Sequence, residues 1–129
     1  MPTYLSAEWL DAAAAAVAGN DALQDVAIDP ALVIQQTVVR DGADPVTWHV
    51  VLGPEGVQWV TGRHPSPAVT FTCDADTAWA VQVGTESAQA AFMAGRLRLG
   101  GDAGALIAHQ RTVADLDDAL AELRARTTR

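Results

Sequence analysis

Residues 91–107 read AFMAGRLRLGGDAGALI, and this stretch carries the clearest pattern in the chain. Its first residues suit the end of a helix. The alternation of apolar and basic residues that follows, with Leu97 and Leu99 on one side, is typical of a strand. Two glycines then precede Asp102, whose side chain and position suit the cap of a following helix. The stretch therefore predicts a helix, a strand and a second helix.

Four more strands are predicted upstream of this unit. Residues 32–40, 46–52 and 57–62 are rich in β-branched side chains and are separated by the turn sequences DGADP and GPEG, which predicts a three-stranded antiparallel meander. Residues 68–73, AVTFTC, form the fourth strand. If each turn sequence closes a hairpin, the cross-strand pairs are Leu52 with Val57, Val50 with Trp59, Trp48 with Thr61 and Arg40 with Val46.

This register gives the sheet two unlike faces, because successive side chains of a strand point to opposite sides. One face carries large apolar side chains and one glutamine, namely Ile34, Gln36, Val38, Trp48, Val50, Leu52, Val57 and Trp59. The other face is more polar, with Gln35, Thr37, Thr47, His49 and Gln58 among some valines. We expect helices to cover the apolar face.

Capping residues and apolar periodicity predict where these helices lie. Ser6 precedes an alanine-rich helix that ends at Gly19. Asp74 and Thr85 begin two short helices between the fourth and fifth strands, and Asp102 begins another beyond the fifth strand.

The last helix is predicted from an amphipathic pattern. Thr112 and Asp115 have the spacing of a capping box, and one apolar stripe consists of Val113, Leu116, Leu120 and Leu123. Taken together, the elements predict a single α+β domain over residues 1–129, with one five-stranded antiparallel sheet and helices on one face.

Composition and charge exclude several classes of protein. The 129-residue chain has 8 Lys+Arg against 16 Asp+Glu, and its formal net charge of -8 disfavours a nucleic-acid partner. It contains no lysine, so it cannot form a Schiff base or a GxxxxGK phosphate loop. No apolar run approaches the roughly 20 residues of a transmembrane helix, and no signal peptide is recognisable. We expect a cytoplasmic protein, and a transient contact with a membrane stays open.

The side chains able to do chemistry form no catalytic or metal-binding pattern. His49, His64 and His109 lie far apart and lack the spacing that places two ligands on one helix face. Cys73 occupies an inward strand position, where a thiol stays protonated. No serine lies in a GxSxG sequence, and GGDAG places Asp102 where a bound anion would lie. We expect no metal, no cofactor and no enzymatic activity.

Large aromatic side chains opposite small ones favour an internal cavity. Trp48, Trp59 and Phe71 lie on the apolar face, whereas the helices expected to cover that face are rich in alanine, which fills little volume. Plain core packing is the simpler interpretation of the same pattern, because large side chains packed on small ones also fill a core.

The stretch at residues 91–107 resembles the hallmark of sterol carrier protein type 2 lipid-binding domains, in which a helix ending in F-M-x-G is followed by a strand of alternating basic and apolar residues and then G-D or G-N. The matching residues are Phe92, Met93, Gly95, Arg96, Leu97, Arg98, Leu99, Gly101 and Asp102. Upstream, a strand followed by Asp74, a short helix with Trp79 and then Val83 and Gly84 is similar to the same family. An alanine-rich, lysine-free composition and a C-terminus without the SKL signal indicate a bacterial stand-alone member.

The resemblance implies that the sheet and helices enclose an apolar tunnel for a fatty acid, a fatty acyl-CoA, a phospholipid or a sterol-like lipid. Binding or transfer of such a ligand requires no catalytic residue, because burial of apolar surface drives it. The residues expected by position to bind the lipid are Trp48, Val50, Trp59, Phe71, Phe92, Met93, Leu97, Leu99, Leu106, Ile107, Leu116 and Leu120, the last two from the terminal helix as a candidate lid.

Two other functions stay open at this point. An accessory or small-molecule enzyme domain using the same cavity would need an internal polar group, and the candidates are Gln36, His109 and Cys73. A protein-interaction module would have a filled core, no cavity of ligand size, and a partner on its exposed sheet face.

Overall fold

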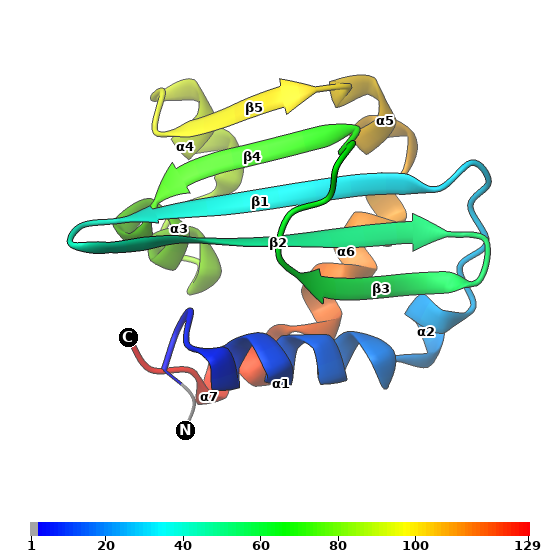
Figure 1. Ribbon diagram of the computed structural model, residues 1–129, viewed down its shortest axis with the longest axis horizontal. Coiled ribbons are helices and arrows are strands. Elements are labelled where there is room, and N and C mark those ends of the chain that lie inside the picture. Colours follow the sequence, from blue (N-terminus) through cyan, green and yellow to red (C-terminus); the bar gives the residue numbers. More distant parts are fainter. Residues whose placement is uncertain (1–2) are drawn as a thin grey trace.

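The computed structural model describes residues 3–129 and contains one sheet with helices behind it (Figure 1). In spatial order the strands are β3 (Gly56–Thr61), β2 (Ala43–Gly53), β1 (Leu32–Arg40), β4 (Val69–Asp74) and β5 (Leu97–Gly101). The helices are α1 (Ala7–Ala18), α2 (Asp21–Gln24), α3 (Ala75–Gln82), α4 (Ala88–Met93), α5 (Ala103–Ala108), α6 (Gln110–Ala119) and α7 (Ala121–Arg126). In Figure 1, α3, α4 and α6 lie behind the sheet, and α1 runs beside β3. The α+β class, the five strands and the one-sided helical cover are confirmed.

The sheet departs from the prediction at one strand pair. Three of the four pairs are antiparallel, but β1 and β4 are parallel, with Gln36 opposite Phe71. A parallel pair needs a crossover connection, and here the chain leaves β3 and crosses in front of β2 and β1 before it enters β4 (Figure 1). The connecting residues 62–68 gave no local signal for this path.

This connection also covers the polar face of the sheet. The backbone N–H of His64 donates to Gln35 Oε1 at 2.8 Å, and His49 Nδ1 donates to the Gly62 carbonyl at 2.9 Å. Gln35 and His49 are buried as a result, although they lie on the face opposite the helices. Their polar atoms are therefore used to hold residues 62–68 against the sheet.

The predicted register is confirmed between β2 and β3. Leu52 pairs with Val57 and Trp48 with Thr61, while Val50 pairs with Trp59. The sequence GPEG thus closes the hairpin as its turn residues predict.

The predicted pair of Arg40 with Val46 is wrong. Val46 pairs with Val38, and Arg40 pairs with Ala43, because the turn is shorter than DGADP and Gly42 supplies its positive φ of 71°. The register shifts between Val38 and Arg40, where β2 contains Pro45. Proline has no N–H to donate to the ladder, so it is tolerated at such an irregularity.

Three predicted helix caps are confirmed. Ser6 accepts a hydrogen bond from the Trp9 N–H at 3.1 Å, Asp74 accepts one from Thr77 at 2.7 Å, and Asp102 accepts one from Ala105 at 3.2 Å. These bonds satisfy backbone donors that the first helical turn leaves unpaired.

Two other predicted caps are wrong. Ser87, not Thr85, caps α4, since its hydroxyl accepts from the Ala90 N–H at 3.0 Å. The Thr112 and Asp115 pair lies inside α6, which begins at Gln110 without a side-chain cap. The helix predicted from that pair is divided at Leu120 into α6 and α7.

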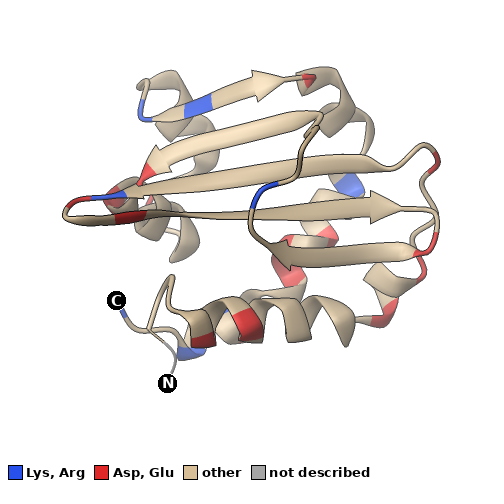
Figure 2. Cartoon of the chain, in the orientation of Figure 1, with Lys and Arg blue, Asp and Glu red and all other residues tan. Residues whose placement is uncertain are grey.

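Charged residues avoid the central strands (Figure 2). β1 and β2 carry one charged residue each, Arg40 and Asp44, next to the turn that joins them. Among residues 3–129, no helix combines the length and the apolar character needed to cross a membrane.

Candidate functional site

A cavity of about 360 Å³ lies between the apolar face of the sheet and the helices. Small-molecule sites in proteins range from roughly 300 to 1,000 Å³ and are mostly apolar. The walls come from β1 to β5, from α1, α3, α6 and α7, and from single residues of α4 and α5. A protein-interaction module with a filled core would not have such a cavity.

One wall of the cavity is aromatic. Trp48 of β2 and Trp59 of β3 stack with ring centroids 5.1 Å apart, and Trp9 of α1 meets them edge-on at 5.7 and 6.0 Å. Tyr4 packs against Trp9 at 4.9 Å. Such pairs contribute about 0.5–1.5 kcal/mol each beyond the area they bury, so they stabilise this arrangement of the rings.

The remaining walls are mainly aliphatic. The sheet contributes Ile34, Val50, Phe71 and Leu97, and the helices contribute Ala78, Val81, Leu106, Val113, Leu116 and Leu120. The apolar stripe predicted for the last helix thus faces the cavity at three of its four positions, and Leu123 is buried in the core.

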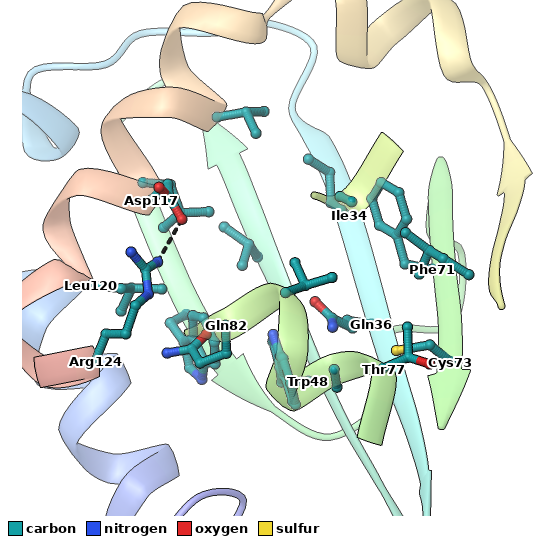
Figure 3. Close-up of a pocket in the computed structure, with 18 of the residues that line it drawn as sticks. Ile34, Gln36, Trp48, Phe71, Cys73, Thr77, Gln82, Asp117, Leu120 and Arg124 are labelled. Atoms are coloured by element: carbon teal, nitrogen blue, oxygen red, sulfur yellow. Dashed lines mark hydrogen bonds and ion pairs between the residues drawn. The ribbon is translucent and has the colours of Figure 1, made fainter. Parts of the chain in front are cut away.

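The polar side of the cavity is formed by Gln82, Asp117 and Arg124, whereas Gln36 and Thr77 lie toward Phe71 and Cys73. Arg124 Nη2 donates to Asp117 Oδ1 at 2.6 Å, and Figure 3 shows Gln82 on the same side as this pair, away from Phe71 and Cys73. The Asp117 side chain is 68% exposed and that of Arg124 is 25% exposed. This ion pair therefore lies where the cavity meets solvent.

Two titratable groups in the walls stay neutral. Burial raises the pKa of the Tyr4 hydroxyl, and burial together with the nearby Asp74 carboxylate raises the pKa of the Cys73 thiol to about 11. Neither group is ionised near neutral pH, so the cavity contains no activated nucleophile from these two residues.

The structure brings together eight of the twelve residues predicted from the sequence. Those that line the cavity are Trp48, Val50, Trp59, Phe71, Leu97, Leu106, Leu116 and Leu120. Their contact with a lipid stays a prediction.

The other four predicted residues do not line the cavity. Leu99 is half-buried on β5 and packs against the core. Phe92, Met93 and Ile107 are 49%, 78% and 71% exposed. For α4 the reason is its rotation, since Ala91 is the residue that this helix buries.

Sequence reasoning missed several lining residues, of which Tyr4, Trp9, Gln82 and Arg124 are the most informative. Helical spacing from Ala78 would have found Gln82, which lies one turn further along α3. Tyr4 carried no local signal, because it is positioned by a long-range hydrogen bond from its N–H to the Thr128 carbonyl at 2.7 Å.

The candidates for an enzymatic role are separated. Gln36 and Cys73 line the cavity, whereas His109 lies in a second, more open hollow of about 410 Å³ beside residues 27–32. Across residues 3–129, no group of three or more His, Cys, Asp or Glu side chains is placed to hold a metal ion.

Comparison with known families matches residues 9–114 to the SCP-2 sterol transfer family. No curated protein matches the sequence.

Several solved structures share the fold. A conserved hypothetical protein from Thermus thermophilus is 19% identical with a TM-score of 0.68, covering 95% of this chain and 90% of its own. Sterol carrier protein 2 is 17% identical with a TM-score of 0.66, covering 90% and 95%. Palmitated sterol carrier protein 2-like 2 from Aedes aegypti is 24% identical with a TM-score of 0.58, covering 84% and 93%.

Proposed function

Because the chain belongs to the SCP-2 sterol transfer family, we propose that it binds an apolar lipid in the cavity and transfers it without catalysing a reaction. The observation that carries the proposal is the cavity itself, about 360 Å³ in volume and walled by Trp48, Trp59 and aliphatic side chains. The Aedes aegypti neighbour is described as palmitated, which supports an acyl chain as the ligand class.

The size of the cavity limits the length of such a chain. At a liquid-like volume of about 30 Å³ per small group, the cavity accommodates roughly a dozen chain atoms. Burying a dozen methylenes at ~0.8 kcal/mol each yields about 10 kcal/mol, of which association entropy removes at least ~4 kcal/mol. We expect a bare twelve-carbon chain to bind with a Kd no tighter than roughly tens of micromolar.

The protonated thiol of Cys73 in the cavity wall supports a role without catalysis. Cys73 is the one cysteine of the chain, and its pKa of about 11 leaves almost no thiolate at neutral pH. Carriers of this kind need shape and apolar surface rather than a reactive group.

The direct test is a titration of protein stripped of bound lipid. A fluorescent acyl-chain probe is added, and energy transfer from Trp48, Trp59 and Trp9, which line the cavity, reports its binding. We expect saturable micromolar binding that unlabelled twelve-carbon chains displace. Absence of saturable binding contradicts the proposal.

A pair of variants shows whether the probe occupies the cavity. Leu116→Trp places a larger side chain in the cavity and is expected to weaken binding at least tenfold, measured by the anisotropy of the probe. Val60→Trp makes the same kind of change at an exposed position of β3 that does not line the cavity, and is expected to leave binding unchanged. Equal affinities for the two variants would place the ligand elsewhere.

A further inference from the structure

The lining of the cavity contains hydrogen-bond donors that the protein does not use. Among residues 3–129, four buried nitrogen atoms of lining side chains have no hydrogen-bond partner, namely Trp9 Nε1, Trp59 Nε1, Gln82 Nε2 and Arg124 Nε. All four carry hydrogen, and no buried oxygen of the described lining is without a partner. Buried donors are almost always satisfied in native proteins, so their concentration in one cavity points to a ligand with acceptor atoms.

The charged residues at the polar side of the cavity determine which kind of hydrogen-bond acceptor a ligand can place there. The charged residues of the lining are Asp117 and Arg124, and they are paired at 2.6 Å, so their charges cancel. A carboxylate placed there would meet the Asp117 carboxylate, and the guanidinium charge would have to be shared between two anions. An uncharged oxygen can accept the same hydrogen bonds without this repulsion.

Resting on the proposed function, we propose that the ligand is a neutral lipid with a carbonyl oxygen at one end, such as a fatty ester or a long-chain ketone, rather than a free fatty acid. Its apolar chain lies along the aromatic and aliphatic walls. Its carbonyl accepts hydrogen bonds at the polar side, where Gln82 and Arg124 provide unpaired N–H groups. The Arg124 and Asp117 pair selects against a negative charge.

The test compares two probes that differ only in their head group, methyl dodecanoate and dodecanoate at pH 8, each followed by the change in tryptophan emission. We expect the ester to bind at least tenfold more tightly than the anion. Equal or tighter binding of dodecanoate overturns this inference and leaves the carrier function standing. If neither probe binds, the proposed function fails, and this inference fails with it.

A substitution of Asp117 tests the charge argument separately. Asp117→Asn leaves Arg124 without its counter-charge, so we expect the affinity for dodecanoate to rise about tenfold and the affinity for the ester to change less than threefold. The matched control is Asp118→Asn, which removes the same charge from the next residue of α6, an exposed position outside the lining. The inference is overturned if Asp117→Asn has no effect on dodecanoate, or if both variants act alike.

A substitution of Gln82 tests the donor. Gln82→Leu replaces the amide with an apolar side chain of comparable bulk, so we expect the ester to bind about tenfold more weakly while binding of dodecane is unchanged. Gln58→Leu makes the same change on the exposed face of β3 and serves as the control. An equal loss for ester and hydrocarbon would assign Gln82 a purely structural role and overturn its part in the site.

Discussion

Two neighbouring regions differ in how much sequence pattern they carry and how much of the cavity they form. Residues 91–107 contain the family-like motif, yet only Leu97 and Leu106 of that stretch line the cavity. Residues 110–124 carry no family-like motif, only an apolar stripe and a capping-box spacing that caps no helix. They contribute Gln110, Val113, Leu116, Asp117, Leu120 and Arg124 to the cavity. The recognisable pattern therefore specifies backbone geometry, while the surface available to a ligand is specified by periodicity.

The backbone role of the motif is clearest at Gly101, the second glycine of its one glycine pair. Gly101 has a φ of 84°, and a Cβ atom at this position would collide with the carbonyl oxygen of Ala68. The N–H of Asp102 donates to that same carbonyl at 2.9 Å. The motif thus joins the end of β5 to the segment that enters β4, and this join sets where α5 begins.

The largest expected effect is on stability, at Gly101. Gly101→Ala combines the positive φ with a collision against Ala68, so we expect a loss of at least about 3 kcal/mol in the free energy of unfolding. Denaturant titration measures this loss. Gly84→Ala is the control, because Gly84 has a similar φ of 80° and open space around it, and it should lose only about 1–2 kcal/mol. Equal losses of unfolding free energy for the two variants would show that the close contact between Gly101 and the Ala68 carbonyl does not affect stability.

The next effect is on reactivity inside the cavity. Because the pKa of Cys73 is raised to about 11 from 9.0, its thiolate fraction at pH 8 is about a hundredfold below that of a free thiol. Iodoacetamide should therefore alkylate the native protein at least about a hundredfold more slowly than the protein unfolded in guanidinium chloride. Bound methyl dodecanoate should slow the reaction further. A native rate close to the unfolded rate would contradict the burial of this wall.

A smaller effect is expected at Asp74, which caps the helix that brings Ala78, Val81 and Gln82 to the cavity. Asp74→Ala should lower the free energy of unfolding by about 1 kcal/mol at pH 7. Hydrogen bonds from Thr77 lower the pKa of the Asp74 carboxyl in the folded protein, so its stabilisation is complete above the unfolded pKa and is lost as the pH falls through the folded pKa.

The difference between wild type and Asp74→Ala should therefore shrink as the pH is lowered below about 4, which denaturant titrations at pH 7 and pH 3 measure. Asp118→Ala, at an exposed position of α6, is expected to change stability by less than about 0.5 kcal/mol at either pH. If Asp74→Ala lowered the free energy of unfolding equally at pH 7 and pH 3, the stabilisation by Asp74 would not depend on the charge of its carboxylate.

The smallest effect is expected at a position of the motif itself. Met93 matches the family-like pattern but is largely exposed, so Met93→Ser should change the free energy of unfolding by less than about 0.5 kcal/mol. Leu97→Ala, in the same stretch but buried in the cavity wall, should lose about 2–4 kcal/mol. If Met93→Ser lowered the free energy of unfolding as much as Leu97→Ala, the exposed motif residue would matter as much for stability as the buried residue of the cavity wall.

Local sequence signals predicted the parts of the fold that depend on neighbouring residues. The hairpin at GPEG placed Trp48 and Trp59 correctly on one face, and the caps at Ser6, Asp74 and Asp102 follow from side chains that bond to their own helix. These features need no knowledge of distant contacts.

The parts that sequence reasoning missed depend on contacts between distant segments. The parallel pairing of β1 with β4 follows from the path of residues 62–68 over the sheet, which turn chemistry does not fix. Tyr4 reaches the cavity through a bond to Thr128, near the opposite end of the chain. Phe92 and Met93 were placed in the cavity because they are apolar, but the rotation of α4 is set by the burial of Ala91.

If the ligand occupies the cavity rather than the exposed apolar residues at the motif, the adjacent residues Leu106 and Ile107 should respond to it differently. Leu106 lines the cavity, while Ile107 faces solvent. Methyl resonances of both side chains are followed by NMR during a titration with methyl dodecanoate. We predict saturable shifts at Leu106, together with Leu116 and Leu120, and none at Ile107 or Met93. Shifts confined to Ile107 and Met93 would place the ligand outside the cavity.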